Sequence, residues 1–335
     1  MEASKSRLFR HIPLETRSGA DRRVGVEIEF AGISSEPILE AIQSLYGGTL
    51  KKHSVFEFKV TSTTLDDFIV ELDAQQLKAL GEKVEIPLDS NNEVDALSVE
   101  KLSMDLISFA AEQLVPWEIV TAPIPFDRMH ELYALEEKLR QAGAKGTRHS
   151  IRYAFGVHLN PEVPNTDSST ILNYLRAFFC LYDWISEEED IDLVRRITPY
   201  INHFDSDYIR LVIDPDYQPD EAELIDDYLK ANPTRNRSLD LLPLFCHMDE
   251  ERLRRVVDDS RVKPRPTFHY RLPNCDIDNP DWSLCQPWER WLQVEALAND
   301  LPRLEACCEA FRKDMERMTR FLDNKWLEKS REYLI

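Results

Sequence analysis

The stretch that decides the fold is Gly25-Val26-Glu27-Ile28-Glu29-Phe30, in which apolar and acidic residues alternate. Successive side chains of a β-strand point to opposite faces, so the apolar residues share one face and Glu27 and Glu29 share the other. Carboxylates at this spacing lie about 7 Å apart between Cα atoms and repel each other unless a cation sits between them. The stretch therefore predicts a strand whose polar face holds a divalent metal, which could in turn hold a nucleotide phosphate.

The same alternation recurs along the chain and predicts a sheet. Residues 67–73, 151–160 and 267–272 alternate in this way, and shorter strands are expected at 55–60 and 117–121. Helices are expected at 35–45, 97–114, 127–142 and 168–186, over much of 187–265 and from 286 onward, with a linker at 86–96. The prediction is an α+β fold with a mainly antiparallel sheet, covered by helices on one face and polar on the other.

Composition narrows the possible partners. The chain has 335 residues, 43% of them hydrophobic, and a net charge of −20. So acidic a protein repels nucleic-acid backbones and anionic membranes, and a nucleotide site in it must be made locally positive by a metal and arginines. We expect neither a signal peptide nor a membrane-spanning segment, and the six cysteines, which form no CxxC pair, predict reduced thiols in a cytoplasmic protein.

Carboxylates crowd the polar face of the predicted sheet. The acidic residues at its strand positions are Glu27, Glu29, Glu57, Glu71, Asp73 and Glu118. A solvated sheet face explains any one of them, but the crowding and the pair in the first strand favour a metal site. Mg²⁺ and Mn²⁺ prefer oxygen ligands, often one or two carboxylates together with substrate phosphates. No zinc, P-loop, dinucleotide or hydrolase motif is present, so phosphates would be held by the metal and by arginines.

Histidines and arginines in later segments are candidates for the same site. His158 falls on the polar face of its strand, although a lone strand histidine is more often structural. His269 and Arg271 lie two residues apart on the last strand. Arg235 and Arg237 follow a proline in a loop, where they could clamp an anion or pair with surface carboxylates.

In this order, the segments resemble those of a known family. The first strand is similar to the GxEIEF strand that opens the catalytic domains of carboxylate–amine ligases related to glutamine synthetase and glutamate–cysteine ligase. The similarity continues in Phe68–Asp73, Glu118–Pro123, Gly156–His158 and Phe268–Arg271. These segments span about residues 23–275, and the amidoligase branch of that superfamily is the nearest match.

The resemblance implies a curved antiparallel sheet of the glutamine-synthetase type, with helices on its convex face and with metal ions and ATP on its concave face. It implies an ATP-dependent ligase that forms an acyl phosphate and then an amide. Glu27, Glu29 and Glu118 would be Mg²⁺ or Mn²⁺ ligands, and His158 would face the phosphates or a metal. Arg271 would act with Glu29 in catalysis by stabilising the transferring phosphoryl group; Arg237 is a second candidate for that task, with Arg235 beside it.

Two positions depart from the family pattern. His269 stands where relatives have a glutamate, and Gly156 stands where many have the first histidine of an HxH strand. One hypothesis is that His269 replaces the imidazole missing at Gly156 and serves as a metal ligand. The alternatives are a changed metal preference, a single-metal site or an inactive relative. Two further functions therefore stay open: a guanidino-kinase-like phosphotransferase, and a non-catalytic binding or scaffold protein descended from a ligase.

The expected organisation is an N-terminal arm at 1–22, a catalytic domain at 23–280 and a C-terminal helical extension at 281–335. In the extension, Leu304, Cys308, Phe311, Met315, Met318 and Leu322 recur at helical spacing. This stripe predicts packing on the main domain or, alternatively, a homodimer contact. The substrates are expected to be the carboxylate and the amine of small molecules or peptides.

Overall fold

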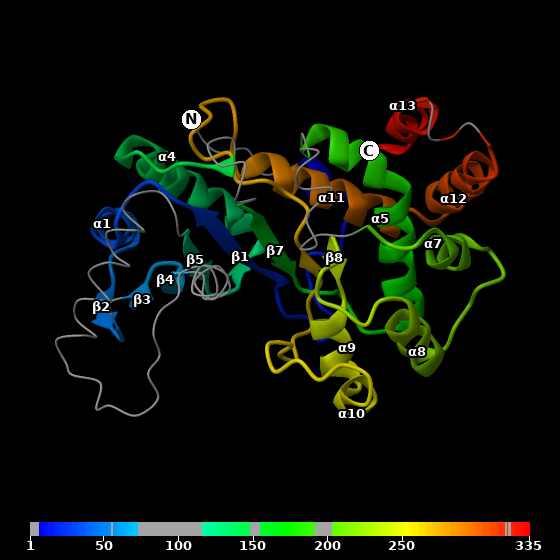
Figure 1. The fold of residues 1–335 in the computed structure, drawn as a ribbon, viewed down its shortest axis with the longest axis horizontal. Coiled ribbons are helices and arrows are strands. Elements are labelled where there is room, and N and C mark those ends of the chain that lie inside the picture. Colours follow the sequence, from blue (N-terminus) through cyan, green and yellow to red (C-terminus); the bar gives the residue numbers. More distant parts are fainter. Residues whose placement is uncertain are drawn as a thin grey trace, which may run out of the picture.

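The structure is a computed structural model, and it describes residues 7–54, 56–72, 116–147, 155–189, 191, 203–318, 320 and 323–335. The expected linker at 86–96, the helix at 97–114, residues 151–154, Asp73 and Leu322 lie outside these ranges. Within them the fold is α+β with an antiparallel sheet, as predicted (Figure 1). The sheet is open and uncurled, whereas the family resemblance implied a curved one.

In the described part of the chain, nine strands form the sheet in the order β2-β3-β4-β5-β1-β7-β9-β8, with β6 paired to the start of β1. All strand pairs are antiparallel. The strands are β1 (Arg23–Phe30), β2 (Thr49–Lys52), β3 (Glu57–Thr63), β4 (Asp66–Leu72), β5 (Trp117–Thr121), β6 (Ile124–Pro125), β7 (Val157–Pro161), β8 (Leu239–Asp240) and β9 (His269–Tyr270). The edge strand β2 is exposed along its whole length and ends in Lys51 and Lys52.

Helices make up most of the rest of the described chain. They are η1 (Arg7–Arg10), α1 (Ser35–Tyr46), η2 (Phe126–Leu132), α4 (Tyr133–Ala142), α5 (Ser168–Glu188), α7 (Ser206–Ile213), α8 (Glu221–Ala231), α9 (Leu242–Met248), α10 (Glu250–Arg254), α11 (Cys285–Asn299), α12 (Leu301–Met315), α13 (Lys325–Ser330) and η5 (Arg331–Tyr333). In Figure 1, α4 and α11 lie above the strands, α5 runs downward to the right of β7 and β8, and α9 and α10 lie below β8. Among the described residues, no helix is long and apolar enough to cross a membrane.

Aromatic side chains join the helices to the apolar face of the sheet. Tyr174 of α5 stacks on Phe268 with ring centroids 5.0 Å apart, and Phe178 of the same helix meets the edge of Tyr270 at 6.1 Å. Trp291 of α11 lies 5.4 Å from Tyr270. These rings are fully or almost fully buried, so α5 and α11 hold β9 firmly in place. The polar side chains of β9 must then point to the opposite face.

Three predicted elements differ from the observed ones. The expected strand at 267–272 is only two residues long, because prolines at 266 and 273 bracket it and cannot donate hydrogen bonds to a sheet. The region 187–265, expected to be helical, also contains β8, which is too short to show an alternating pattern. The helix expected to start at Asp127 begins as the 3₁₀ helix η2 and becomes α-helical only at Tyr133.

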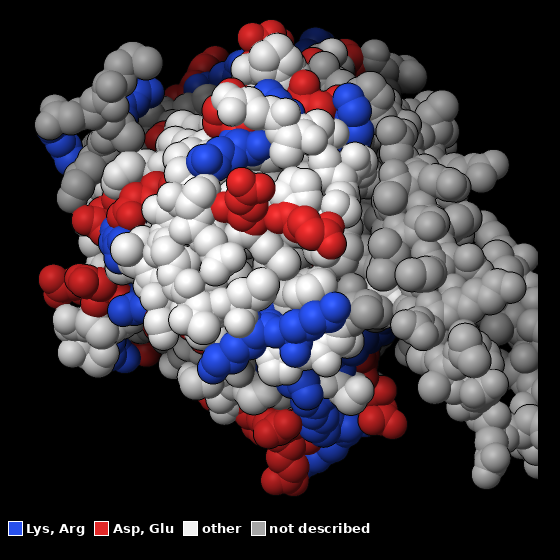
Figure 2. All heavy atoms as spheres, turned by 90° about the vertical axis from the view of Figure 1, so that its left-hand side faces the viewer, with Lys and Arg blue, Asp and Glu red and all other residues white. Residues whose placement is uncertain are grey.

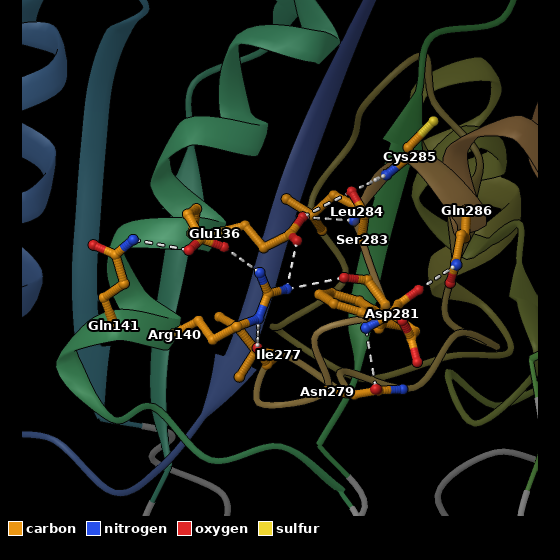
Figure 3. A network of polar contacts seen from close by, with 12 residues as sticks. Glu136, Arg140, Gln141, Ile277, Asn279, Asp281, Ser283, Leu284, Cys285 and Gln286 are labelled. Atoms are coloured by element: carbon orange, nitrogen blue, oxygen red, sulfur yellow. Dashed lines mark hydrogen bonds and ion pairs between the residues drawn. The ribbon is translucent and has the colours of Figure 1, made fainter.

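The segment between β9 and α11 is tied to α4 by a polar network (Figure 3). The Glu136 carboxylate accepts hydrogen bonds from the backbone N–H of Leu284 at 2.8 Å and from the hydroxyl of Ser283 at 3.0 Å. Arg140 donates to Glu136 at 2.7 Å and to the carbonyl oxygen of Ile277 at 2.8 Å. Because Glu136 is buried, these bonds are protected from water and fix the chain that leaves β9.

The C-terminal stripe packs within the chain. Leu304, Cys308, Phe311 and Met315 are buried on α12, which contacts α5. The helix ends at Met315, earlier than the stripe suggested, and Met318 beyond it is 98% exposed. Packing on the main domain therefore accounts for the stripe from Leu304 to Met315 but not for Met318. The homodimer and the domain boundaries stay predictions.

Charge is unevenly distributed on the surface. Figure 2 shows the side of the molecule that carries α1 and β2, where a band of basic side chains lies below the centre and acidic side chains lie above and beneath it. The net charge of −20 is therefore compatible with local positive regions.

The described residues of the N-terminal arm, 7–22, are anchored to the rest of the fold. Leu8, Ile12 and Arg22 are buried. The Arg22 guanidinium makes two hydrogen bonds, at 2.7 and 2.8 Å, to the carboxylate of Glu295 in α11, and both side chains are fully buried. Glu295 also accepts hydrogen bonds from Tyr174 and Trp291. This network clamps the residue before β1 to the two helices that cover the sheet.

We predict that Arg22→Met lowers the free energy of unfolding by about 3–5 kcal/mol, because it leaves the Glu295 charge buried without a cation. Urea denaturation followed by circular dichroism would measure the change. Arg17→Met is the matched control: its ion pair with Asp167 is 72% and 43% exposed, and its loss should cost less than about 1 kcal/mol. Equal effects of the two substitutions would contradict the prediction.

Candidate active site

The register of the central strands sets four glutamates in one row across the polar face. Glu57 of β3 lies opposite Glu71 of β4, Glu71 opposite Glu118 of β5, and Glu118 opposite Glu29 of β1. Directly opposite residues on one face bring their Cβ atoms to about 5 Å. The row runs from exposed Glu57 to Glu29, whose side chain is 13% exposed. Negative charge is thus concentrated toward the centre of the sheet.

Gly156, which stands where the family motif often has a histidine, holds the Glu29 side chain in position. The backbone N–H of Gly156 donates to Glu29 Oε2 at 2.8 Å, and the Gly156 carbonyl accepts from the Glu29 N–H at 3.0 Å. This leaves Glu29 Oε1 directed toward His158, whose Nε2 is 3.9 Å away. Gly156 lacks the imidazole of the family motif, but its backbone fixes the Glu29 carboxylate by a hydrogen bond.

A chain of hydrogen bonds connects the remaining polar side chains of β1, β7 and β9. His158 Nδ1 lies 3.0 Å from Glu27 Oε2, and Asn160 Nδ2 donates to Glu27 Oε1 at 2.9 Å. Asn160 Oδ1 in turn lies 2.8 Å from His269 Nδ1. The two imidazole rings meet edge to face with centroids 5.2 Å apart. One asparagine thus links Glu27 to the second histidine.

This chain fixes the tautomers of both histidines. Since Asn160 uses its amide N–H on Glu27, its oxygen must accept, and His269 Nδ1 must carry the proton. His158 Nδ1 likewise donates to the Glu27 carboxylate. In the neutral form of each ring the lone pair is therefore on Nε2, the atom that a metal would take. A histidine that donates its other nitrogen to a carboxylate or amide is the usual arrangement at metal centres.

The electrostatics of the chain agree with these tautomers. Burial favours the neutral form of Glu27, but the hydrogen bond from His158 and nearby positive charge outweigh it and hold the pKa of Glu27 well below its usual range. Burial lowers the pKa of His269 well below its usual range, against the opposing pull of Glu27. An ionised carboxylate beside a neutral imidazole is the protonation state that metal binding requires.

Among the residues that the structure describes, two groups of three side chains bring ligand atoms within 4.8 Å of one another, and both include His158. The first is Glu29, Glu118 and His158; the second is Glu27, His158 and His269. The first group offers two carboxylates and one imidazole, a donor set that suits Mg²⁺ or Mn²⁺. The second is richer in nitrogen and would suit a softer divalent ion. The predicted ligands thus come together, with His158 at their centre.

The predicted arginines separate into two places. Arg271 lies two residues after His269, and its Nη1 donates to the carbonyl oxygen of Arg235 at 2.6 Å. The positive charges of Arg271 and Arg235 both favour the charged form of buried Asp240, which lies opposite His269 in the sheet. Arg237 is elsewhere: it donates to the carbonyl oxygens of His203 and Ala231 and so supports the start of α7 and the end of α8.

Asp240 and Asn160 are parts of the site that sequence reasoning did not single out. Asp240 Oδ1 accepts from the Leu242 N–H at 2.9 Å, whereas Oδ2 has no hydrogen-bond partner among the described residues. Burial raises the pKa of Asp240 to about 6, although that hydrogen bond and nearby arginines favour its charged form. No sequence signal marked Asp240, because β8 has only two residues. Asn160 fell on the predicted polar face and could have been suspected from its spacing to His158.

A comparison with protein families places these residues in a known group. A family model described as "Putative amidoligase enzyme" matches residues 20–293, which include every strand of the sheet. No curated protein and no solved structure matches the chain at a significant level. The match covers most of the chain and all the side chains of the candidate site, so the protein belongs to this amidoligase family.

Proposed function

We propose that the protein is an ATP-dependent carboxylate–amine ligase that works through an acyl phosphate with a divalent metal. The observation that carries the proposal is the group formed by Glu29, Glu118 and His158, with ligand atoms within 4.8 Å of one another on adjacent central strands. The family match supports amide-bond formation as the reaction class. The substrates are proposed to be the carboxylate and the amine of small molecules or peptides.

In this proposal Glu29, Glu118 and His158 Nε2 hold Mg²⁺ or Mn²⁺, which would neutralise charge on the phosphates of ATP. Glu27 then has a different task from the one predicted for it. Both its oxygens are engaged by His158 and Asn160, so it orients the imidazole and strengthens it as a ligand. The backbone N–H of Gly156 orients the Glu29 carboxylate in a similar way, by donating a hydrogen bond to it.

The reaction would have two displacements. A carboxylate oxygen of the first substrate attacks the γ-phosphorus of ATP, and ADP leaves. The amine then attacks the acyl carbon, inorganic phosphate leaves, and one amine proton passes to solvent or phosphate. Arg271 lies two residues after His269 and close enough to act on the charge of that imidazole, and in this proposal its positive charge stabilises the oxygens of the transferring phosphoryl group. Arg235 adds a second positive charge there.

We expect Glu118→Gln to weaken Mn²⁺ binding at least tenfold, because the substitution removes the charge of a direct ligand. Isothermal titration calorimetry with Mn²⁺ alone would measure the affinity. Glu57→Gln is the control, since Glu57 is the exposed end of the same row. An unchanged affinity in Glu118→Gln, with a correctly folded protein, would remove the proposed metal site.

His269→Ala tests the second group of ligands. If Glu27, His158 and His269 hold a metal, the variant should bind one equivalent less Mn²⁺ or bind it more weakly in the same titration. If His269 serves only to position Asn160, stoichiometry should stay the same. Unchanged stoichiometry and affinity would contradict the hypothesis that His269 replaces the imidazole missing at Gly156.

The activity itself is tested by ADP release from ATP with Mg²⁺ or Mn²⁺ across pooled carboxylates and amines. We expect release that depends on both pools, and a loss of at least about 100-fold in Glu29→Gln and in Arg271→Met. Arg271→Met should keep its Mn²⁺ affinity, and Arg261→Met, which lies in an exposed ion pair, is the control. Release that needs no amine would favour a phosphotransferase. No release and no ATP binding would favour a non-catalytic protein.

A further inference from the structure

Two cysteines from distant parts of the chain lie in contact between α5 and α12. Cys180 Sγ and Cys308 Sγ are 3.8 Å apart, and Cys180 is fully buried while Cys308 is 7% exposed. All six cysteines of the chain are free thiols in the structure. A disulfide has a sulfur–sulfur distance of about 2.05 Å, so a shift of less than about 2 Å would join the pair.

A cavity is lined by one of the two cysteines and not by the other. It has a volume of about 90 Å³ and is lined by Cys308 together with Arg176, Glu305 and apolar residues of α12. Several water-sized molecules fit in such a space. Cys180 does not line the cavity, so the two thiols differ in what can reach them.

The charges around the pair also differ. The Arg176 side chain is fixed by hydrogen bonds to the carbonyl oxygens of Val212, Asp214 and Tyr217, so its positive charge stays in the wall of the cavity. The hydrogen bond from Cys180 and the charge of Arg176 lower the pKa of Cys308, against burial and Glu305. Burial raises the pKa of the Cys180 thiol well above its usual value.

We propose that Cys308 and Cys180 form a peroxide-reactive thiol pair that closes to a reversible disulfide. The Cys308 thiol loses its proton to solvent, the thiolate attacks one oxygen of hydrogen peroxide, and the O–O bond breaks. The product is a sulfenic acid, and the hydroxide that leaves takes up a proton to become water. The Cys180 thiol then attacks the sulfenic sulfur, and a second water leaves as the disulfide forms. One peroxide thus oxidises two thiols, and a cellular thiol can reverse the change. This inference does not depend on the proposed ligase activity.

Cys307 is the alternative partner and must be separated from Cys308 by experiment. Cys307 is fully buried and directly precedes Cys308 in α12, so the two side chains lie on different sides of the helix. Both fall in one tryptic peptide, residues 304–312, whereas Cys180 is alone in residues 177–195. A cross-linked pair of these peptides therefore identifies Cys180, and only variants can identify its partner.

The test treats the purified full chain with hydrogen peroxide and counts thiols after unfolding in denaturant. We expect a loss of two thiols per chain, restored by dithiothreitol, and a cross-link between the two peptides by mass spectrometry. Cys307→Ser should keep the cross-link, and Cys308→Ser should lose it. Cys180→Ser should instead leave a sulfenic acid at Cys308, which dimedone traps. Thermal melting of each reduced variant checks that it is folded.

Three outcomes would overturn the proposal. The first is no loss of thiols at peroxide concentrations that oxidise glutathione in the same buffer. The second is a cross-link that survives in Cys308→Ser and disappears in Cys307→Ser, which would assign the reaction to the other cysteine. The third is a disulfide between two chains, seen as a dimer on a non-reducing gel, with no cross-link inside one chain.

Discussion

The antiparallel register of β1 with its two neighbours is the constraint on which the candidate site depends. It sets Glu29 opposite Glu118 on one side and Glu27 opposite His158 on the other. A slip of one residue would turn the glutamates into the core and the apolar side chains to the polar face. The buried positions of β1 oppose such a slip, because Val24, Val26, Ile28 and Phe30 are all at most 1% exposed. Hydrophobic packing on one face therefore fixes the chemistry on the other.

The side chains around His158 are organised by hydrogen bonds rather than by strand geometry alone. Asn160 uses its two amide atoms in opposite senses, donating to Glu27 and accepting from His269. It therefore determines which nitrogen is free on each ring. The hydrogen bond to Asn160 explains how the sheet accommodates a histidine in place of a glutamate at position 269. It gives the buried Nδ1 atom of His269 a hydrogen-bond partner.

The sequence predicted those parts of the site that depend on the alternation of side chains along a strand, which has a period of two residues. The faces of β1, β4 and β5 were predicted correctly, because long alternating strands carry a clear pattern. The sequence could not indicate that Glu27 is engaged by His158, since that contact depends on the pairing of strands 131 residues apart. Asp240 was missed because a strand of two residues has no period. Arg235 and Arg237 were both predicted to face the bound nucleotide, but in the structure Arg237 donates to the His203 carbonyl whereas the charge of Arg235 acts on Asp240.

The two edges of the sheet have a consequence for association between copies of the chain. An edge strand exposes unpaired backbone groups and can pair with the edge of another molecule, which is a route to aggregation. Here one edge, β2, places the charges of Lys51 and Lys52 along its exposed length. The other edge, β8, offers only two residues before α9 begins. Within the described residues, the like charges along β2 and the shortness of β8 both disfavour pairing of these edges with another copy of the chain.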